Sequence, residues 1–213
     1  MPRTDLIHWQ TLWRELGGVG EVSAWHTRLV KAYSEPLRRY HNLQHLAECL
    51  DELDLSRKLA RRPALIEIAL WFHDAVYDPP STSNEEDSAV LAETCLKDRQ
   101  VAHDQIETVR GLILSTKTHE VGADSDTALL IDIDLAILGK PAERFWAYER
   151  GIRAEYGWVP ETTYRQKRAE ILASFLARPM IYRVPSFRDR YEIPARANLS
   201  AAIARLKTVP VDD

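Results

Sequence analysis

Residues 65–77 of this chain read LIEIALWFHDAVY. The first eight of these residues are almost entirely apolar, so we expect them to form a helix that is largely buried. The adjacent pair His73 and Asp74 comes at the end of this apolar run. A buried carboxylate needs a compensating positive group, and a metal ion is one of the few that fits beside a neighbouring imidazole.

The composition is that of an ordinary globular protein. The chain has 213 residues, of which 45% are hydrophobic and 28% are charged, and its net charge of −4 gives no reason to expect a nucleic-acid partner. Its two cysteines, Cys49 and Cys95, lie in apolar helical contexts and are expected to be inert thiols in a reducing compartment. Neither a signal peptide nor a membrane-spanning run is recognisable, so we expect a cytoplasmic protein without a membrane partner. The oligomeric state stays open.

The hydrophobic pattern is helical almost throughout, with proline or a capping residue at most expected helix starts. We expect helices over about residues 5–16, 21–33, 36–60, 63–74, 85–99, 104–115, 128–138, 141–156, 160–177 and 194–206. A loop is expected over 117–126 and a loose tail over 209–213. No segment alternates with the period of a strand and no linker divides the chain, so the sequence predicts one all-α domain over residues 1–213.

Four further segments carry recognisable motifs. Residues 39–45 read RYHNLQH, residues 84–89 read NEEDSA, residues 132–139 read DIDLAILG and residues 195–199 read ARANL. Together with the His-Asp pair, these motifs resemble the HD superfamily, and within it a bacterial branch of predicted metal-dependent phosphohydrolases of about this length. The resemblance covers nearly the whole chain. It implies a single HD-type helical bundle. Arg196 and Asn198 are expected to cap or brace the bundle, although Asn198 could instead reach a carboxylate.

The resemblance also implies a ligand set for a divalent metal ion, namely His41, His73, Asp74 and Asp134. Asp132 is the competing choice for the last ligand. It lies two residues from Asp134, about 200° around a regular helix, so both cannot bind one ion. Imidazoles and carboxylates together suit Mn, Fe, Co, Ni, Zn or Mg, and whether one or two ions bind stays open.

Such an ion would lower the pKa of a bound water, which could then attack a phosphate ester. Asp74 would act with the ion, while Glu85 or Glu86 could orient the water or act as general base; the alternative is a solvated acidic helix start. His45 is either a second ligand, a substrate contact or a buried structural histidine. His119 is a candidate phosphate or water contact.

Arg39 and Lys117 are candidate phosphate contacts, although either could be plain surface charge. The chain contains neither a Gly-rich phosphate loop nor a Gly-x-Ser-x-Gly elbow, which excludes two common enzyme classes. The sequence therefore predicts a phosphohydrolase that uses a metal-bound water on a small phosphorylated metabolite, of which a nucleotide is one candidate. The alternative is a non-catalytic ligand-binding or regulatory HD module, and a third candidate is an HD oxygenase with a di-iron site.

Overall fold

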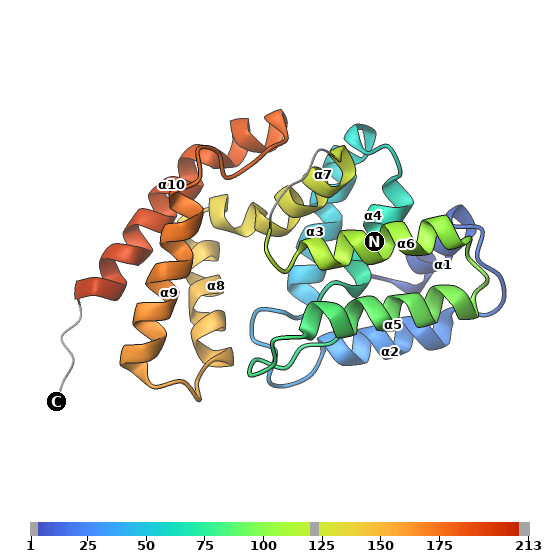
Figure 1. Ribbon diagram of the computed structural model, residues 1–213, viewed down its shortest axis with the longest axis horizontal. Coiled ribbons are helices and arrows are strands. Elements are labelled where there is room, and N and C mark those ends of the chain that lie inside the picture. The colour runs from blue at the N-terminus through green and yellow to red at the C-terminus, as the bar shows by residue number, and fades with distance from the viewer. Residues whose placement is uncertain (1–3, 120–123, 209–213) are drawn as a thin grey trace. The chain divides into compact units, whose positions relative to one another are not determined.

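The computed structural model describes residues 4–119 and 124–208, and within these ranges the protein is helical without strands. The predicted all-α fold is therefore confirmed (Figure 1). The helices in chain order are α1 (Leu6–Glu15), α2 (Ser23–Tyr33), α3 (Leu43–Ser56), η1 (Arg57–Leu59), α4 (Pro63–Phe72), α5 (Asn84–Asp98), α6 (His103–Ser115), α7 (Ser125–Asp134), η2 (Leu135–Gly139), α8 (Ala142–Glu155), α9 (Glu161–Leu176) and α10 (Pro185–Thr208). The expected tail over 209–213, and residues 120–123 of the expected loop, lie outside the described residues.

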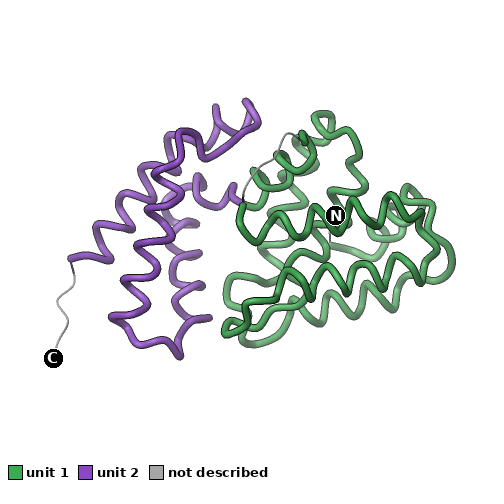
Figure 2. The backbone as a smooth tube through the Cα atoms, viewed as in Figure 1, with its two compact units in different colours: residues 1–134 green, residues 135–213 purple. Residues whose placement is uncertain are grey.

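The chain divides into two compact units, unit 1 over residues 1–134 and unit 2 over residues 135–213 (Figure 2). Each unit is described by itself below. That the two units make up one domain stays a prediction. None of the helices in the described ranges combines the length and apolar character that crossing a membrane requires.

Helix α4 is the centre of unit 1. Each of its residues from Leu65 to Phe72 is buried, as the apolar run predicts. The helix packs against α1, α3, α5, α6 and α7, so its whole circumference is covered by other helices. The end of α4 therefore delivers His73 and Asp74 to the interior of the unit.

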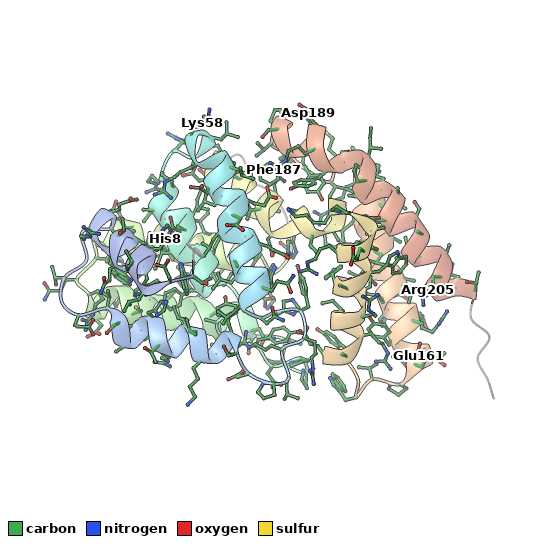
Figure 3. All side chains as sticks on the ribbon, turned by 180° about the vertical axis from the view of Figure 1, so that it is seen from behind. His8, Lys58, Glu161, Phe187, Asp189 and Arg205 are labelled. Atoms are coloured by element: carbon green, nitrogen blue, oxygen red, sulfur yellow. The ribbon has the colours of Figure 1, made fainter. Side chains whose placement is uncertain are left out.

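One charged residue, Glu67, interrupts this buried helix and has two partners. Its Oε1 lies 2.6 Å from Nε2 of His8 on α1, which Figure 3 labels, and its Oε2 lies 2.7 Å from Nη1 of Arg57. Arg57 also contacts Glu15, at 2.6 Å. The partners offset the cost of burying the carboxylate, and they link α1, η1 and α4.

The expected helix over 36–60 is wrong at its start. Helix α3 begins at Leu43, because the Asn42 side chain accepts hydrogen bonds from the backbone N–H groups of Gln44 and His45 and so caps the helix there. His41 therefore lies in the preceding loop, whereas the expected helix over 36–60 would have carried both His41 and His45.

The expected start of the last helix at Pro194 is also wrong. Helix α10 begins at Pro185, and Pro194 lies inside it. A proline at the first helical position has no hydrogen bond to lose, which explains the earlier start, whereas Pro194 leaves one carbonyl of the helix without its usual donor.

The Arg196 and Asn198 side chains brace unit 2, as predicted. Arg196 donates to the backbone carbonyls of Leu176 and Arg178 at the end of α9, at 3.0 and 2.7 Å. Asn198 donates to the carbonyls of Leu138 and Lys140, at 2.9 Å each. Both contacts satisfy carbonyls that helix ends leave without an intrahelical donor.

A buried ion pair joins α8 to α9 in the same unit. The Arg168 guanidinium lies 2.5 Å from the Glu149 carboxylate and 2.6 Å from the Tyr148 hydroxyl. Because Arg168 is only 7% exposed, these partners supply the charge and hydrogen bonds that its burial requires.

Candidate metal centre

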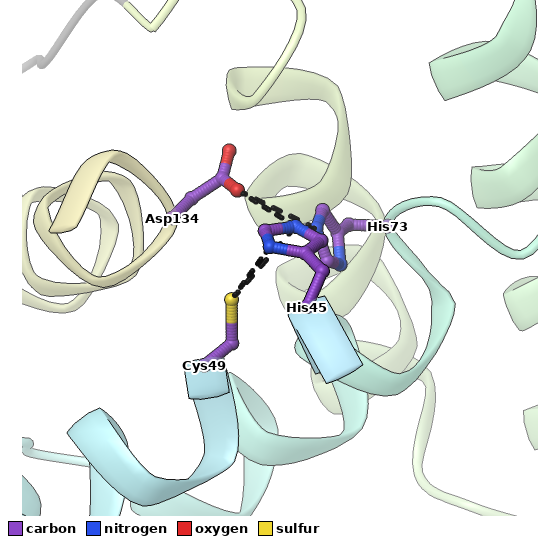
Figure 4. A group of neighbouring side chains, drawn as sticks. All are labelled: His45, Cys49, His73 and Asp134. Carbon is purple, nitrogen blue, oxygen red and sulfur yellow. Dashed lines mark hydrogen bonds and ion pairs between the residues drawn. The ribbon is translucent and has the colours of Figure 1, made fainter. Parts of the chain in front are cut away.

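Three helices of unit 1 bring a group of potential metal ligands together. His45 and Cys49 lie one turn apart on α3, His73 is the C-cap of α4, and Asp134 is the last residue of α7 (Figure 4). One ligand atom of each residue lies within 4.8 Å of the ligand atoms of the other three. His45, Cys49 and His73 are almost completely buried. The group could hold a metal ion.

The Asp74 carboxylate also reaches this group. Oδ2 of Asp74 lies 3.1 Å from Nε2 of His73 and 3.4 Å from Nε2 of His45. Oδ1 of Asp134 lies 3.6 and 3.3 Å from the same two nitrogens, which are themselves 3.2 Å apart. Donor atoms bound about 2.0 Å from one ion lie roughly 3 Å apart, so these nitrogen–nitrogen and nitrogen–oxygen separations would suit a shared ion.

Asp74 fits this arrangement better than Cys49. Sγ of Cys49 lies 3.7 Å from Nδ1 and 3.9 Å from Nε2 of His45. An ion on the Nε2 lone pair lies on the side of the imidazole away from Nδ1, so a sulfur on that ion would be clearly farther from Nδ1 than from Nε2. The observed sulfur is nearer to Nδ1 than to Nε2. The geometry therefore favours two imidazoles and two carboxylates as the ligands of an ion.

Two of the four donor residues, His73 and Asp134, are oriented by hydrogen bonds to groups that are not donors themselves. Nδ1 of His73 lies 2.8 Å from the Leu70 carbonyl, and donating to it leaves Nε2 with its lone pair toward the carboxylates. Nε2 of His119 lies 2.9 Å from Oδ2 of Asp134. The His119 backbone has a φ of 50°, a left-handed conformation that costs free energy and is often found at functional sites.

The electrostatics of the cluster call for positive charge. Burial lowers the pKa of His45, but the nearby Cys49 and Tyr40 side chains raise it by more, so it lies well above the usual range. Burial likewise lowers the pKa of His73, but the Asp74 carboxylate raises it by more, so it also lies well above the usual range. Burial raises the pKa of Asp74, yet His73 and other imidazoles hold it well below the usual range.

Asp134 behaves in the same way. Burial raises its pKa, but hydrogen bonds from His119, His45 and His73 hold the pKa of this carboxyl well below its usual range. Two carboxylates are thus kept ionised in a buried cluster. Without an ion, the raised pKa values of His45 and His73 let two imidazoliums balance these charges, and a divalent cation would take over that role by displacing their protons.

The structure distinguishes the two aspartates that the sequence left in competition. Asp134 belongs to the cluster, whereas Asp132 is completely buried and lies outside the group of potential ligands. His41 lies outside that group as well. Its ring centroid is 4.3 Å from that of Tyr77 and 6.0 Å from that of His45. The His41 imidazole helps to lower the pKa of Asp74, and metal binding by His41 stays a prediction.

Four of the expected substrate and water contacts are exposed or half-buried residues of unit 1, namely Arg39, Glu85, Glu86 and Lys117. Lys117 forms an ion pair with Glu86 and donates to the Thr82 carbonyl, at 2.8 Å. This pair lowers the pKa of Glu86. Within the described residues, Glu85 at the start of α5 forms no hydrogen bond or ion pair. Arg39 is exposed on the loop before α3.

Arg38, which sequence reasoning missed, holds the loop before α3 against the His-Asp turn. Its guanidinium is buried and donates to the backbone carbonyls of His41, Asp74 and Ala75. Arg38 directly precedes the exposed Arg39 in the sequence. Its place near the Tyr-His motif is the only feature of the sequence that could have indicated its role. Burial separates the two arginines, and burial depends on tertiary contacts.

The second cysteine, Cys95, is free and completely buried. Burial raises the pKa of its thiol, which favours the protonated form, and its expected inertness stays a prediction.

Comparisons with known proteins add no relative to this picture: no family model, no curated protein and no solved structure matches the chain.

Proposed function

We propose that this protein is a metal-dependent phosphohydrolase that acts on a small phosphorylated metabolite, such as a nucleotide. The observation that carries the proposal is the convergence of two imidazole nitrogens and two carboxylate oxygens, with separations of 3.1–3.6 Å, in the interior of unit 1. The resemblance of the sequence motifs to the HD superfamily supports the same class of activity.

In this proposal His45, His73, Asp74 and Asp134 hold one divalent ion. Two imidazoles favour a first-row transition metal such as Mn, Fe, Co or Ni, or Zn, and two carboxylates also admit Mg. A bound ion would lower the pKa of a coordinated water and polarise a phosphoryl oxygen. Asp74 and Asp134 are the most exposed of the four donors, with side-chain exposures of 18% and 13%, so substrate approaches from the carboxylate side of the cluster.

His119 has a positioning role in this scheme. Its hydrogen bond to Oδ2 of Asp134 leaves Oδ1, the atom near the two imidazoles, for the ion. Outer-shell partners of this kind orient a ligand and raise its basicity.

The test is a panel of phosphorylated metabolites offered to protein stripped with a chelator and then reloaded with Mn²⁺, Fe²⁺, Ni²⁺, Co²⁺, Zn²⁺ or Mg²⁺. Ion content is measured beside phosphate release. We expect release of inorganic phosphate only from ion-loaded protein. If loaded protein binds a phosphate ester tightly but turns none over, the non-catalytic module is correct, and two bound irons would favour the oxygenase.

Replacing Glu85 and Glu86 one at a time with glutamine tests whether either residue is the general base or whether Glu86 only forms an ion pair. Glu86→Gln is expected to lower kcat less than about tenfold, because a carboxylate whose pKa is lowered by Lys117 is a weak base. Loss of a true general base typically costs about 10²–10⁴-fold, and Glu85→Gln, made in parallel, tests the other candidate. The measurements are kcat and ion content.

Glu93 offers a matched control for this comparison. It lies on α5 as well and has its pKa lowered in the same way, by Lys97. Glu93→Gln should leave kcat unchanged. If Glu86→Gln lost 10²-fold or more at full ion occupancy, Glu86 would be the base.

A further inference from the structure

The guanidinium of Arg38 joins two loops that are far apart in the sequence. Its Nη1 donates to the backbone carbonyls of His41 and Asp74, at 3.3 and 2.5 Å, and its Nη2 donates to the carbonyl of Ala75, at 3.0 Å. Its Nε donates to Oε2 of Glu35, at 3.3 Å. One planar group therefore holds the loop before α3 and the turn that follows α4 in a fixed relation.

Burial makes this contact an unusual one for an arginine. The Arg38 side chain is 2% exposed, whereas that of Glu35, its ion-pair partner, is 55% exposed. The rings of Tyr33 and Tyr77 enclose the guanidinium, with centroids 5.2 and 5.5 Å from Cζ. Because burying a charge costs free energy and a buried ion pair often adds little net stability, the main consequence of the contact is the geometry that it fixes.

The turn after α4 carries one of the proposed ligands. The carbonyl that accepts from Nη1 of Arg38 belongs to Asp74, whose carboxylate lies 3.1 and 3.4 Å from the two imidazole nitrogens of the cluster. Further along the turn, the Val76 N–H donates to the Ser88 hydroxyl, at 3.1 Å. Arg38 thus anchors the backbone of the ligand residue itself, and Ser88 anchors the turn two residues later.

We propose that Arg38 is a positioning residue for the metal ion, which holds the backbone of Asp74 so that its carboxylate lies beside the two imidazoles before the ion arrives. The inference rests on the proposed metal site. A donor that is already in place binds an ion more tightly, because no free energy is lost in ordering it. The rigid fork of a guanidinium suits this role, since it can hold carbonyls on the loop and on the turn at once.

Arg38→Lys keeps the positive charge but removes the planar fork, and it is the direct test, with MnCl₂ as the probe. Outer-shell partners of metal ligands typically contribute about 10–100-fold to affinity. Arg38 acts on the backbone of one ligand, so we expect the Mn²⁺ affinity measured by calorimetry to fall about tenfold. Circular dichroism checks that the variant is folded. Arg38→Met, which buries no charge, takes its place if the lysine variant does not fold.

A double-mutant cycle tests whether Arg38 acts through Asp74. The Mn²⁺ affinity is measured for the wild type, for Arg38→Lys, for Asp74→Ala and for the double variant, and electron paramagnetic resonance of free Mn²⁺ follows the weakest binding. If the lysine only displaces the Asp74 carboxylate, it should change the affinity less than about twofold once that carboxylate is absent. A general loosening of the fold would instead lower the affinity by the same factor in both backgrounds.

Arg168→Lys is the matched control. Arg168 is also a buried arginine, its guanidinium also pairs with a glutamate, and its Cζ lies 5.1 Å from the centroid of the Tyr148 ring. It belongs to unit 2, whereas the four proposed ligands belong to unit 1. This variant should lose stability, and its Mn²⁺ affinity should equal that of the wild type.

Three outcomes separate this inference from the proposed function. If wild-type protein binds no Mn²⁺, both the metal site and the role of Arg38 are wrong. If Arg38→Lys binds Mn²⁺ as tightly as the wild type, or if its loss of affinity is the same with and without the Asp74 carboxylate, only the role of Arg38 is wrong. If the affinity falls as expected while no phosphate ester is hydrolysed, the role of Arg38 stands and the enzyme proposal fails.

Discussion

Asp74→Ala is expected to abolish hydrolysis and to weaken ion binding severely. The substitution removes the carboxylate oxygen that lies 3.1 and 3.4 Å from the two imidazole nitrogens, and it leaves Asp134 as the only anionic donor among the four. Loss of an outer-shell partner typically costs about 10–100-fold in metal affinity, so loss of a ligand should cost more. Ion content after gel filtration and phosphate release are the two measurements.

Asp51→Ala is the control for this variant. Asp51 is an exposed aspartate on α3, the helix that carries His45. Its replacement should leave ion content and turnover unchanged. Full activity in Asp74→Ala, with circular dichroism showing an intact fold, would rule out the proposed mechanism.

Gly139→Ala is expected to have the largest effect on stability. A Cβ at Gly139 would lie 2.6 Å from Cβ, 2.8 Å from the carbonyl oxygen and 2.9 Å from Cα of Tyr191 on α10. Two of these atoms belong to the backbone, so a side chain cannot rotate away and α10 itself must move. Overpacking of this kind typically costs about 1–3 kcal/mol or more, which chemical denaturation would detect.

Gly111→Ala is a control that is expected to raise the stability, whereas Gly139→Ala is expected to lower it. Gly111 lies within α6, and an added Cβ would meet nothing within 4 Å. Replacing a glycine inside a helix with alanine should stabilise the protein by about 0.5–1 kcal/mol. If Gly139→Ala were as stable as the wild type, the close packing of η2 against α10 would be wrong.

The sequence by itself determined the helical class, the central helix and part of the candidate metal cluster. The apolar run before His73 requires burial on all sides, and only a helix surrounded by other helices provides it, as α4 shows. Helical geometry also required a choice between Asp132 and Asp134, and the structure places Asp134 in the cluster. These features depend on local pattern, which the sequence displays directly.

The tertiary structure alone showed that His45 belongs to the candidate cluster and that His41 lies in the loop before α3. The spacing of His41 and His45 suits one helix face, but the cap at Asn42 starts the helix after His41. The role of Arg38 was also invisible in the sequence. Its guanidinium donates to the carbonyls of Asp74 and Ala75, 36 and 37 residues away. Burial and contacts between distant segments arise only when the helices pack, and for that reason no local pattern reveals them.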